Sequence, residues 1–347
     1  MTTSRPTLTI AVPTYNRAAY LSLQLEQLGR ERSGLEEPQQ VELLVSDNCS
    51  PDETRSVVEA ASSGGLQLRY LRNTANIGSD RNIAQCFNEA RGRYVLIMGD
   101  DDLLVDGVLV QLIRLLQDTT PGVVLLRPFG YDQDFRAECP GSEGEWITYR
   151  DAGSFLLRAG AHITLISACV IRKELLEPLN ATQFVGGNLV QVHLVLRAIM
   201  KSEVNVSFEG FAVACKRNNS GGYVFSQVFV QELSSILEQY RADGLTNDLI
   251  HRYESRLLTA FYPYYIWRQT RAPSSDLALS EEHFDSRFGG RWEYRLLIRP
   301  MFTLPRPMAL IWGTAAMALG RILGGDLRRG MHLVRFRIKH RVRASLK

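Results

Sequence analysis

The sequence lacks the cysteine patterns of a disulfide-stapled or zinc-binding protein. Its five cysteines are odd in number and widely spaced, and no two are separated by only two residues. This usage supports neither a disulfide framework nor a zinc site, and it favours a reducing, cytoplasmic compartment. The N-terminus is polar and runs directly into an apolar segment, so we expect no secretory signal.

Long apolar runs and common cofactor signatures are also missing. The longest charge-free run near the C-terminus is Pro307–Gly320, which has 14 residues, whereas a membrane-spanning helix needs roughly 20. The chain contains no glycine-rich dinucleotide fingerprint, no phosphate-binding P-loop, no zinc-protease helix motif and no serine-hydrolase elbow. These absences argue against a dinucleotide oxidoreductase and against a P-loop NTPase.

Acidic residues are scarce in the C-terminal part of the chain. Residues 291–347 hold 13 Lys and Arg residues and two acids, a net charge of +11, while the whole chain has a formal charge of +3. Residues 1–290 therefore carry a net charge of −8. An acidic body with a basic tail predicts that the tail meets an anionic surface, and we expect that surface to be a membrane, not nucleic acid.

Strand-like and helix-like segments alternate over the first part of this 347-residue chain. Strands are predicted at Leu8–Val12, Val41–Val45, Leu66–Leu71, Tyr94–Met98 and Val123–Leu126. Their alternation with helices implies a mainly parallel sheet with helices on both faces. Beyond about Tyr223 the pattern is mostly helical. We therefore predict an α/β domain over residues 1–225 and a helical, basic region over residues 226–347.

Other local features give finer expectations. Ser50 and Pro51 favour a helix that begins at Pro51 with Ser50 as its cap. Prolines and glycines interrupt residues 127–163, which we interpret as a long loop or a small subdomain. Residues 164–171 look strand-like, residues 189–200 helical, and residues 204–208 and 211–214 like two short strands.

Four polar, turn-rich segments follow predicted strands, at residues 13–17, 47–50, 73–80 and 99–102. Ligands of such sheets bind at the carboxyl ends of the strands, so the four segments should converge. The last one places Asp100, Asp101 and Asp102 directly after a buried strand. Adjacent carboxylates repel one another unless a cation lies among them, and oxygen ligands suit Mg²⁺ or Mn²⁺. A solvated acidic turn is the alternative.

The same residues resemble a known family. Ala11–Arg17, Val45–Thr54, Asn76–Asn82 and Gly99–Asp102 look like the four N-terminal motifs of family 2 glycosyltransferases, in order and in spacing. Their variants look most like the branch that includes abequosyltransferase-type O-antigen enzymes. The resemblance covers roughly residues 7–225.

The resemblance implies the GT-A fold, a Rossmann-like α/β fold with a mainly parallel central sheet flanked by helices. It also implies a hexosyl- or deoxyhexosyl-transferase with a nucleotide-sugar donor. The implied acceptor is a glycan or a lipid-linked glycan in the synthesis of a bacterial surface polysaccharide, either O-antigen or capsule.

The resemblance further assigns residues to the donor and to a Mg²⁺ or Mn²⁺ ion. In the family the first motif passes close to the nucleotide base, Asp47 would accept hydrogen bonds from the base, and the Asp triplet would hold the metal on the diphosphate. The implied nucleotide-binding residues are Pro13, Thr14, Tyr15, Arg17, Asp47, Asn76, Gly78, Asp80, Arg81, Asp100 and Arg217. The implied metal ligands are Asp100, Asp101, Asp102 and Asn219. Simpler alternatives are a turn cap for Asp47 and a surface helix position for Arg81.

Two positions depart from the family pattern. Gly99 stands where the family has the first carboxylate of its metal motif, which leaves the choice of ligand among the three aspartates open. Aligning Leu194–Arg197 with the family's Leu-x-Leu-Arg places Gln191 where a carboxylate supplies the catalytic base. One candidate base is His193, with an ordinary pKa of about 6.5. The other candidate role is Gln191 as a residue that positions the sugar in a retaining mechanism.

The C-terminal part suggests further contacts. Arg217 is expected to reach phosphate, with Asn218 or Asn219 in place of a family histidine; a glycine-rich connector is the alternative. Apolar residues between 302 and 322, flanked by arginines, predict a peripheral attachment to the inner face of the cell membrane. A buried helix or a homo-oligomer contact is the alternative reading of that segment.

Two other classes of protein remain compatible with parts of the sequence. A sugar-phosphate nucleotidyltransferase shares the sheet type and the metal, but it normally has a glycine-rich, Arg-containing N-terminal loop, which residues 13–17 do not provide. A non-catalytic protein that binds a nucleotide-sugar or a glycan fits the missing carboxylate.

Overall fold

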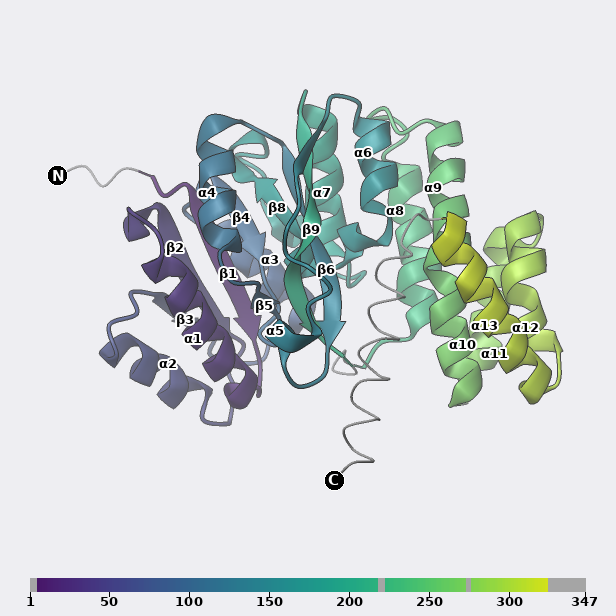
Figure 1. Ribbon diagram of the computed structural model, residues 1–347, viewed down its shortest axis with the longest axis horizontal. Helices are drawn as coiled ribbons and strands as arrows, with labels where there is room; N and C mark the ends of the chain where they lie inside the picture. Colours follow the sequence, from purple (N-terminus) through teal and green to yellow (C-terminus); the bar gives the residue numbers. More distant parts are fainter. Residues whose placement is uncertain (1–4, 218–221, 273–275, 324–347) are drawn as a thin grey trace. The chain divides into compact units, whose positions relative to one another are not determined.

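The computed structural model describes residues 5–217, 222–272 and 276–323 (Figure 1). The chain divides into two compact units. The first unit takes residues up to 155 together with 162–220, and the second takes residues 156–161 and the chain from 221 onward.

The first unit is built on a sheet of nine strands. In chain order these are β1 (Leu8–Thr14), β2 (Val41–Asp47), β3 (Arg69–Arg72), β4 (Tyr94–Ile97), β5 (Leu103–Leu104), β6 (Val123–Tyr131), β7 (Trp146–Tyr149), β8 (Cys169–Arg172) and β9 (Asn205–Lys216). Their spatial order is β3-β2-β1-β4-β8-β6-β9-β5, and β7 pairs with β9. The half from β3 to β4 is parallel, whereas β8 runs antiparallel to both of its neighbours.

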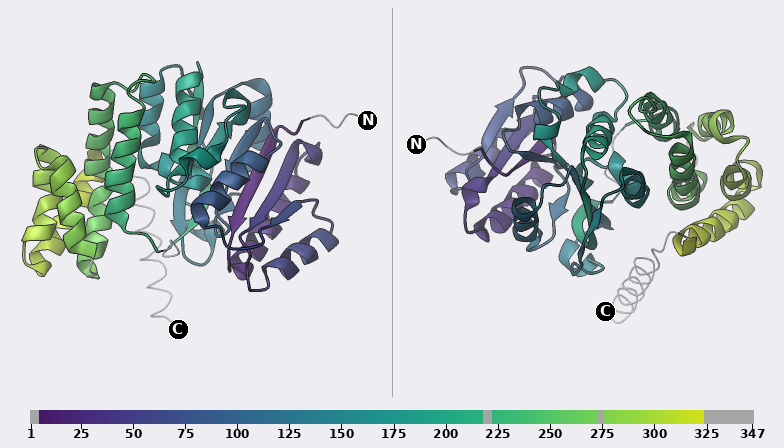
Figure 2. Two further views of the ribbon diagram at one scale, coloured as in Figure 1. Left: turned by 180° about the vertical axis from the view of Figure 1, so that it is seen from behind. Right: turned by 90° about the horizontal axis from the view of Figure 1, so that it is seen from above.

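Helices cover both faces of this sheet, as the sequence predicts (Figure 2). They are α1 (Ala18–Ser33), α2 (Thr54–Ser63), α3 (Ser79–Glu89), α4 (Val108–Asp118), α5 (Phe135–Glu138) and α7 (Val190–Lys201), with α6 (Ala152–Ala159) crossing into the second unit. Helices α3 and α7 pack together on one face, and α1 and α4 pack together on the other. Leu21, Leu25 and Leu28 form the buried side of α1, at the spacing of one helical face.

The helix expected from Pro51 begins instead at Thr54. The residues before it are engaged in holding the neighbouring loop. The Ser50 hydroxyl accepts a hydrogen bond from the Asn16 amide (2.9 Å), and the Asp52 carboxylate accepts one from the Ala18 amide (2.9 Å). The predicted start was wrong. Ser50 serves a neighbour that is remote in sequence, and Asp52 binds both that neighbour and the Thr54 amide at the start of α2 (3.1 Å).

The segment expected to be a loop contains regular structure. Strand β6 continues to Tyr131, and α5, β7 and α6 follow it. A break in register beside Pro128 accommodates the residue that has no backbone N–H to donate. Residues 160–168 are short 3₁₀ turns, not a strand, and only Cys169–Arg172 joins the sheet. The two short strands predicted near residue 210 form the single long strand β9.

The second unit is helical in its described part, as the sequence predicts. Its helices are α8 (Leu233–Gln239), α9 (Asn247–Ala260), α10 (Tyr262–Arg271), α11 (Asp276–Phe288), α12 (Arg299–Thr303) and α13 (Arg306–Leu323). Buried aromatic rings pack edge to face between them, as Tyr262 does on Phe284. None of the described helices has both the length and the apolar character that crossing a bilayer requires.

Helix α13 packs on its unit through small residues. Ala309, Gly313, Ala316 and Gly320 are buried and recur at helical spacing. A Cβ atom added at Gly320 would lie 2.0 Å from the Thr259 carbonyl oxygen on α9. The side of α13 that faces the unit is therefore packed too closely against its neighbours to admit larger side chains.

Candidate functional site

The register of the sheet brings several predicted site residues to one edge. Thr14 at the end of β1 pairs in register with Asp47 at the end of β2, and Asp47 pairs with Arg72 at the end of β3. Strand β4 is parallel to β1 and ends at Ile97, so the chain from Gly99 onward emerges beside Thr14. The expected convergence of turn segments at the carboxyl edge follows from this pairing.

Asp100 and Asp101 share a cation supplied by the chain itself. The Arg17 guanidinium lies 3.2 Å from the Asp100 carboxylate and 3.1 Å from the Asp101 carboxylate. The Thr14 hydroxyl donates a hydrogen bond of 2.8 Å to the other Asp100 oxygen. Of the three aspartates, Asp101 is the least buried. Its carboxylate is the one placed to meet a ligand from solvent.

Asp102 is held from inside the protein. The Ser167 hydroxyl donates a hydrogen bond of 2.5 Å to its carboxylate and accepts one of 2.9 Å from the Gly99 amide. The buried Gln24 side chain on α1 donates to the backbone carbonyls of Gly99 and Asp102. These contacts fix the backbone of residues 99–102, which we call the acidic turn. They come from two elements that lie far apart in the sequence.

Burial makes charge expensive in this turn. It raises the pKa of Asp100 to about 6, against the opposing effect of Arg17. It also raises the pKa of Asp102 to about 7, and the neighbouring charge of Asp101 adds to the rise. The ionised forms of Asp100 and Asp102 are therefore unfavourable in the protein alone. A ligand that brings positive charge to the turn would stabilise them.

Asp47 is fully buried and serves three partners. Its carboxylate accepts hydrogen bonds from the Ser50 amide (2.8 Å) and from the Tyr70 hydroxyl (2.6 Å), and it pairs with Arg72 at 3.2 Å. Burial, followed by the bond to Asp47, raises the pKa of the Tyr70 hydroxyl. The turn cap considered from the sequence is thus present, together with a cation from β3 that sequence reasoning missed.

The loop that carries Asn76 and Gly78 is shaped by side-chain amides. The Asn48 side chain donates to the Asn76 side chain (2.8 Å) and accepts from the Ile77 amide (2.9 Å). The Asn76 oxygen also accepts from the Gly78 amide (2.9 Å). Gly78 has a φ of 86°, a conformation that favours glycine, and it precedes α3.

Asp80 binds two backbone amides of a loop that is remote in sequence, and its contact with the donor remains a prediction. Its carboxylate accepts hydrogen bonds from the Gly186 amide (2.7 Å) and from the Asn188 amide (3.0 Å). It thereby joins the first turn of α3 to the loop that precedes α7. The next residue, Arg81, is exposed. Pro13, in the last part of β1, is half-buried, and Tyr15 is exposed in the loop after β1.

The two catalytic candidates lie near the start of α7. The Gln191 amide donates a hydrogen bond of 2.6 Å to the Thr164 carbonyl, and its side-chain oxygen is buried without a hydrogen-bond partner in the described structure. His193 is buried and stacks on Phe184 with ring centroids 4.4 Å apart. Burial, and then the charge of Arg197, lowers the pKa of His193 to about 4. Both roles remain predictions, and the lowered pKa counts against His193 as the base.

Arg217 is engaged by acidic partners on the β6–α5 connection. Its guanidinium lies 2.7 Å from the Asp132 carboxylate and 2.9 Å from the Glu138 carboxylate, and it also donates to the Gly130 carbonyl. Its contact with phosphate remains a prediction. Asn218 and Asn219 lie outside the described residues.

A preformed metal centre is not evident in the part of the chain that the structure describes. Within it, no group of three or more His, Cys, Asp and Glu side chains is arranged to hold an ion. The oxygens of the acidic turn are nevertheless the donor type that Mg²⁺ and Mn²⁺ prefer. They suit an ion that takes its remaining ligands from a bound diphosphate.

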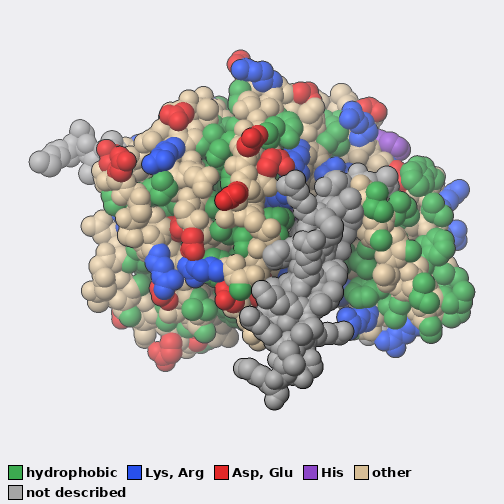
Figure 3. All heavy atoms as spheres, viewed as in Figure 1, with side chains coloured by type: hydrophobic (Ala, Val, Ile, Leu, Met, Phe, Trp, Pro, Cys, Tyr) green, Lys and Arg blue, Asp and Glu red, His purple; other side chains and the backbone are tan. Residues whose placement is uncertain are grey.

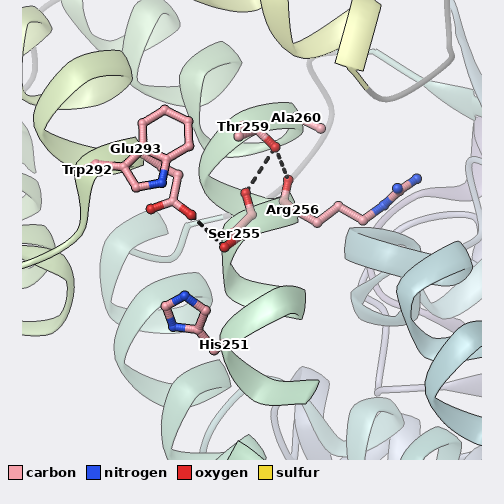
Figure 4. A pocket seen from close by; sticks show the side chains of 7 residues that line it. All are labelled: His251, Ser255, Arg256, Thr259, Ala260, Trp292 and Glu293. Carbon is pink, nitrogen blue, oxygen red and sulfur yellow. Dashed lines mark hydrogen bonds between the residues drawn. The ribbon is translucent and has the colours of Figure 1, made fainter. Parts of the chain in front are cut away.

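A cavity of about 440 Å³ lies in the second unit (Figure 4). Residues of α9 and the segment after α11 line it, and none of them is a residue that the sequence singled out: His251, Ser255, Arg256, Thr259, Ala260, Trp292 and Glu293. The Ser255 hydroxyl donates to Glu293, and the Thr259 hydroxyl donates to backbone carbonyls of its own helix. Ser255, Thr259 and Glu293 therefore already have hydrogen-bond partners within the protein.

Sequence reasoning missed three residues that support the acidic turn and its neighbour. Arg72 carries a detectable signal, because it is the last residue of a strand in a parallel sheet. Ser167 and Gln24 carry none, since one lies in a 3₁₀ turn and the other on a helix, and each reaches the site only through the tertiary fold.

Comparison with known proteins relates the first unit to one family. Residues 9–179 match the family described as glycosyl transferase family 2. Abequosyltransferase RfbV of Salmonella typhimurium is 33% identical over 99 residues, which are 28% of each chain. A Campylobacter jejuni protein named GalNAc(5)-diNAcBac-PP-undecaprenol beta-1,3-glucosyltransferase is 29% identical over 110 residues, 31% of this chain and 34% of its own. The chain thus spans about a third of the length of these relatives.

Solved structures show the fold over most of the chain. TarS 1–349 of S. aureus aligns with a TM-score of 0.60 at 16% identity, over 93% of this chain and 92% of its own. TarS has also been solved with UDP-GlcNAc. The mannosyltransferase PcManGT of Pyrobaculum calidifontis, in complex with GDP-Man and Mn²⁺, aligns with a TM-score of 0.51 at 19% identity, over 90% and 87%. The GT-A fold expected from the resemblance is confirmed.

Proposed function

Since this chain is a member of glycosyl transferase family 2, we propose that it transfers a sugar from a nucleotide-diphosphate donor to a glycan or lipid-linked glycan. The product would belong to a bacterial surface polysaccharide, either O-antigen or capsule. The observation that carries the proposal is the convergence of Thr14, Asp47 and the Asp100–Asp102 turn at one sheet edge. The names of two relatives support the same function, because each is that of a bacterial glycosyltransferase.

The donor would lie along that edge. Asp47 offers a buried carboxylate to base N–H groups, and Arg17 and Arg81 offer cations to the phosphates. Tyr15, Asn76 and Gly78 lie in the loops that border the edge, and their exposure leaves them accessible. The UDP-GlcNAc complex of TarS and the GDP-Man complex of PcManGT support a nucleotide-sugar as the ligand class. The base and the sugar are left open.

A divalent ion, Mg²⁺ or Mn²⁺, would be held by Asp101 with Asp100 or Asp102 and by the donor diphosphate. When bound, it neutralises charge on the leaving nucleotide. The Mn²⁺ in PcManGT supports an ion in such a fold. The chain itself contributes the carboxylates of Asp100 and Asp102. Their raised pKa values mean that their ionised forms are unfavourable unless a cation is near. Arg17 supplies part of that positive charge in the donor-free protein.

Gln191 is our candidate for orienting the reacting sugar or the acceptor hydroxyl. Its side-chain oxygen is a buried acceptor that lacks a partner in the described structure, and an unsatisfied buried acceptor costs about 1–3 kcal/mol. A hydroxyl of the substrate would satisfy it. Gln191 cannot take up a proton at neutral pH, so a retaining course fits this residue better than an inverting one.

Removing these two side chains separates their roles. We expect Gln191→Ala to lower the transfer rate by about tenfold to a hundredfold, the effect of losing one or two positioning hydrogen bonds. We expect His193→Ala to change it far less, because a pKa of about 4 makes His193 a weak base. NMR of the product gives the anomeric configuration. Abolished transfer in His193→Ala, with donor binding intact and an inverted product, would reverse the assignment.

The first test of the function itself is a screen of nucleotide-sugars by thermal shift, with and without Mn²⁺. A donor that stabilises the protein is then incubated with it, and release of the nucleotide is measured. We expect metal-dependent release. Stabilisation without any release, even with acceptor glycans present, would identify a non-catalytic binding protein. Release of pyrophosphate from a sugar phosphate and a nucleoside triphosphate would identify a nucleotidyltransferase.

We place the reaction in the cytoplasm, at the inner face of the cell membrane. The undecaprenol in the name of the Campylobacter relative is a lipid carrier, which supports a membrane-held acceptor for this chain too. The basic composition of residues 291–347 is complementary to an anionic leaflet. A homo-oligomer remains a further proposal.

A further inference from the structure

Helix α13 exposes its large apolar side chains and buries its small ones. An ordinary surface helix does the opposite, with apolar residues inward and polar ones outward. Here the buried side consists mainly of glycine and alanine, whereas Ile311 is 72% exposed and Ile322 is 59% exposed. The packing at Gly313 and Gly320 leaves no room to turn the large residues inward.

The exposed residues form one continuous stripe. They recur at intervals of three and four positions along one side of the helix: Met308, Ile311, Trp312, Ala315, Leu319 and Ile322. The exposed Leu296 extends the stripe, because the Trp312 indole donates to the Leu296 carbonyl at 2.9 Å. Figure 3 shows hydrophobic side chains gathered over the helices at the right of the view. We call this set the α13 stripe.

The charged residues of the segment that carries the α13 stripe have one sign. Residues 294–323 contain four arginines and no acidic residue. Arg295, Arg299 and Arg306 are exposed beside the stripe. The sequence that follows, residues 324–347, adds eight Lys and Arg residues against one acid. An apolar surface whose own chain segment carries cations and no acid is complementary to the interface of an anionic bilayer, where apolar groups enter the acyl region and arginines meet headgroups.

We propose that the α13 stripe is a docking surface for an anionic membrane, on which α13 lies parallel to the bilayer plane. The described helices are too short or too polar to span, so attachment would be interfacial and reversible. This inference rests on the proposed function in one respect: a lipid-linked acceptor would give the protein a reason to attach to a membrane. The chemistry of the stripe itself is independent of the reaction.

Co-sedimentation of the full-length protein with vesicles tests the surface. The vesicles are phosphatidylcholine with and without phosphatidylglycerol, at low and high salt. We expect strong binding only to the anionic vesicles at low salt. The variant Ile311→Ser/Leu319→Ser should bind at least about tenfold more weakly, because it removes apolar area that would enter the bilayer. Arg299→Gln should weaken binding about fivefold at low salt and not at high salt.

A matched control makes the same chemical change elsewhere. Leu23→Ser/Ile147→Ser replaces one exposed leucine and one exposed isoleucine of the first unit, and it should bind vesicles as the unchanged protein does. Equal binding by the α13 variant and this control would overturn the proposal. So would a concentration-dependent dimer that the α13 variant abolishes, without any vesicle binding by the unchanged protein, since the stripe would then contact a second copy.

Donor binding, measured on the same preparations, keeps this inference distinct from the proposed function. We expect the α13 variant to bind the nucleotide-sugar normally. If the unchanged protein fails to bind vesicles but still transfers sugar, only the docking surface is refuted. Vesicle binding that succeeds in a protein without transferase activity supports the surface and refutes the function.

Discussion

Nucleotide-sugar binding is expected to fall by at least about a hundredfold when Asp101 is replaced by alanine, and by a similar factor in EDTA. Asp101 is the least buried carboxylate of the acidic turn, and its neighbours are held by Thr14 and Ser167. Its loss removes the group best placed to share a divalent ion with the diphosphate. Calorimetry with and without Mn²⁺ measures both effects.

The Asp101→Ala variant should remain folded. Asp101 contributes repulsion that raises the pKa of Asp102, so its removal relieves unfavourable charge, and Arg17 keeps its pair with Asp100. Asp118→Ala, at the exposed end of α4, is the matched control and should bind donor normally. Undiminished binding in both Asp101→Ala and EDTA would eliminate the metal from the proposal.

The second large effect is expected at Asp47. Replacing it by alanine should weaken nucleotide binding by about tenfold to a hundredfold, the value of a buried charge-assisted hydrogen bond of about 1.5–3 kcal/mol. The same change leaves Tyr70, Arg72 and the Ser50 amide without their acceptor. We therefore also expect the free energy of unfolding to fall by about 1–3 kcal/mol, without loss of the fold.

Tyr70→Phe separates the two consequences. It removes one hydrogen bond to Asp47 but keeps the carboxylate, so it should lower the free energy of unfolding and leave donor binding nearly intact. Chemical denaturation and calorimetry on both variants give the comparison. If Asp47→Ala binds donor as well as Tyr70→Phe does, Asp47 is a turn residue only.

The sequence predicts the sheet edge well because the signal there is local. Short apolar runs such as Tyr94–Met98 read as buried strands, and turn residues follow each of them. The parallel order then brings Thr14, Asp47 and the acidic turn together without knowledge of any side-chain contact. What failed was local structure that depends on remote partners, such as the start of α2, where Ser50 and Asp52 bind the loop after β1.

The contacts of individual site residues could not be predicted for the same reason. Asp80 finds its partners 106 and 108 positions away, and Arg217 finds Glu138 79 positions away. Burial lowers the pKa of His193 and makes it a weaker base than the sequence suggests. No local sequence pattern shows whether a histidine on a helix is buried. The sequence shows that the α13 segment is apolar with flanking arginines, but only the structure shows which side of it faces water.

The carboxylate of Asp80 ties two loops that belong to different halves of the proposed reaction. Asp80 stands two residues after Gly78, in the segment that we propose borders the donor. It holds the Gly186 and Asn188 amides just ahead of Gln191, which we propose orients the sugar or the acceptor. A displacement of the Gly78 turn by an arriving nucleotide would therefore be transmitted mechanically to the start of α7. Such a linkage would favour an ordered binding of substrates, in which the loop at residues 186–188 and the start of α7 reach their final positions only after the donor has bound.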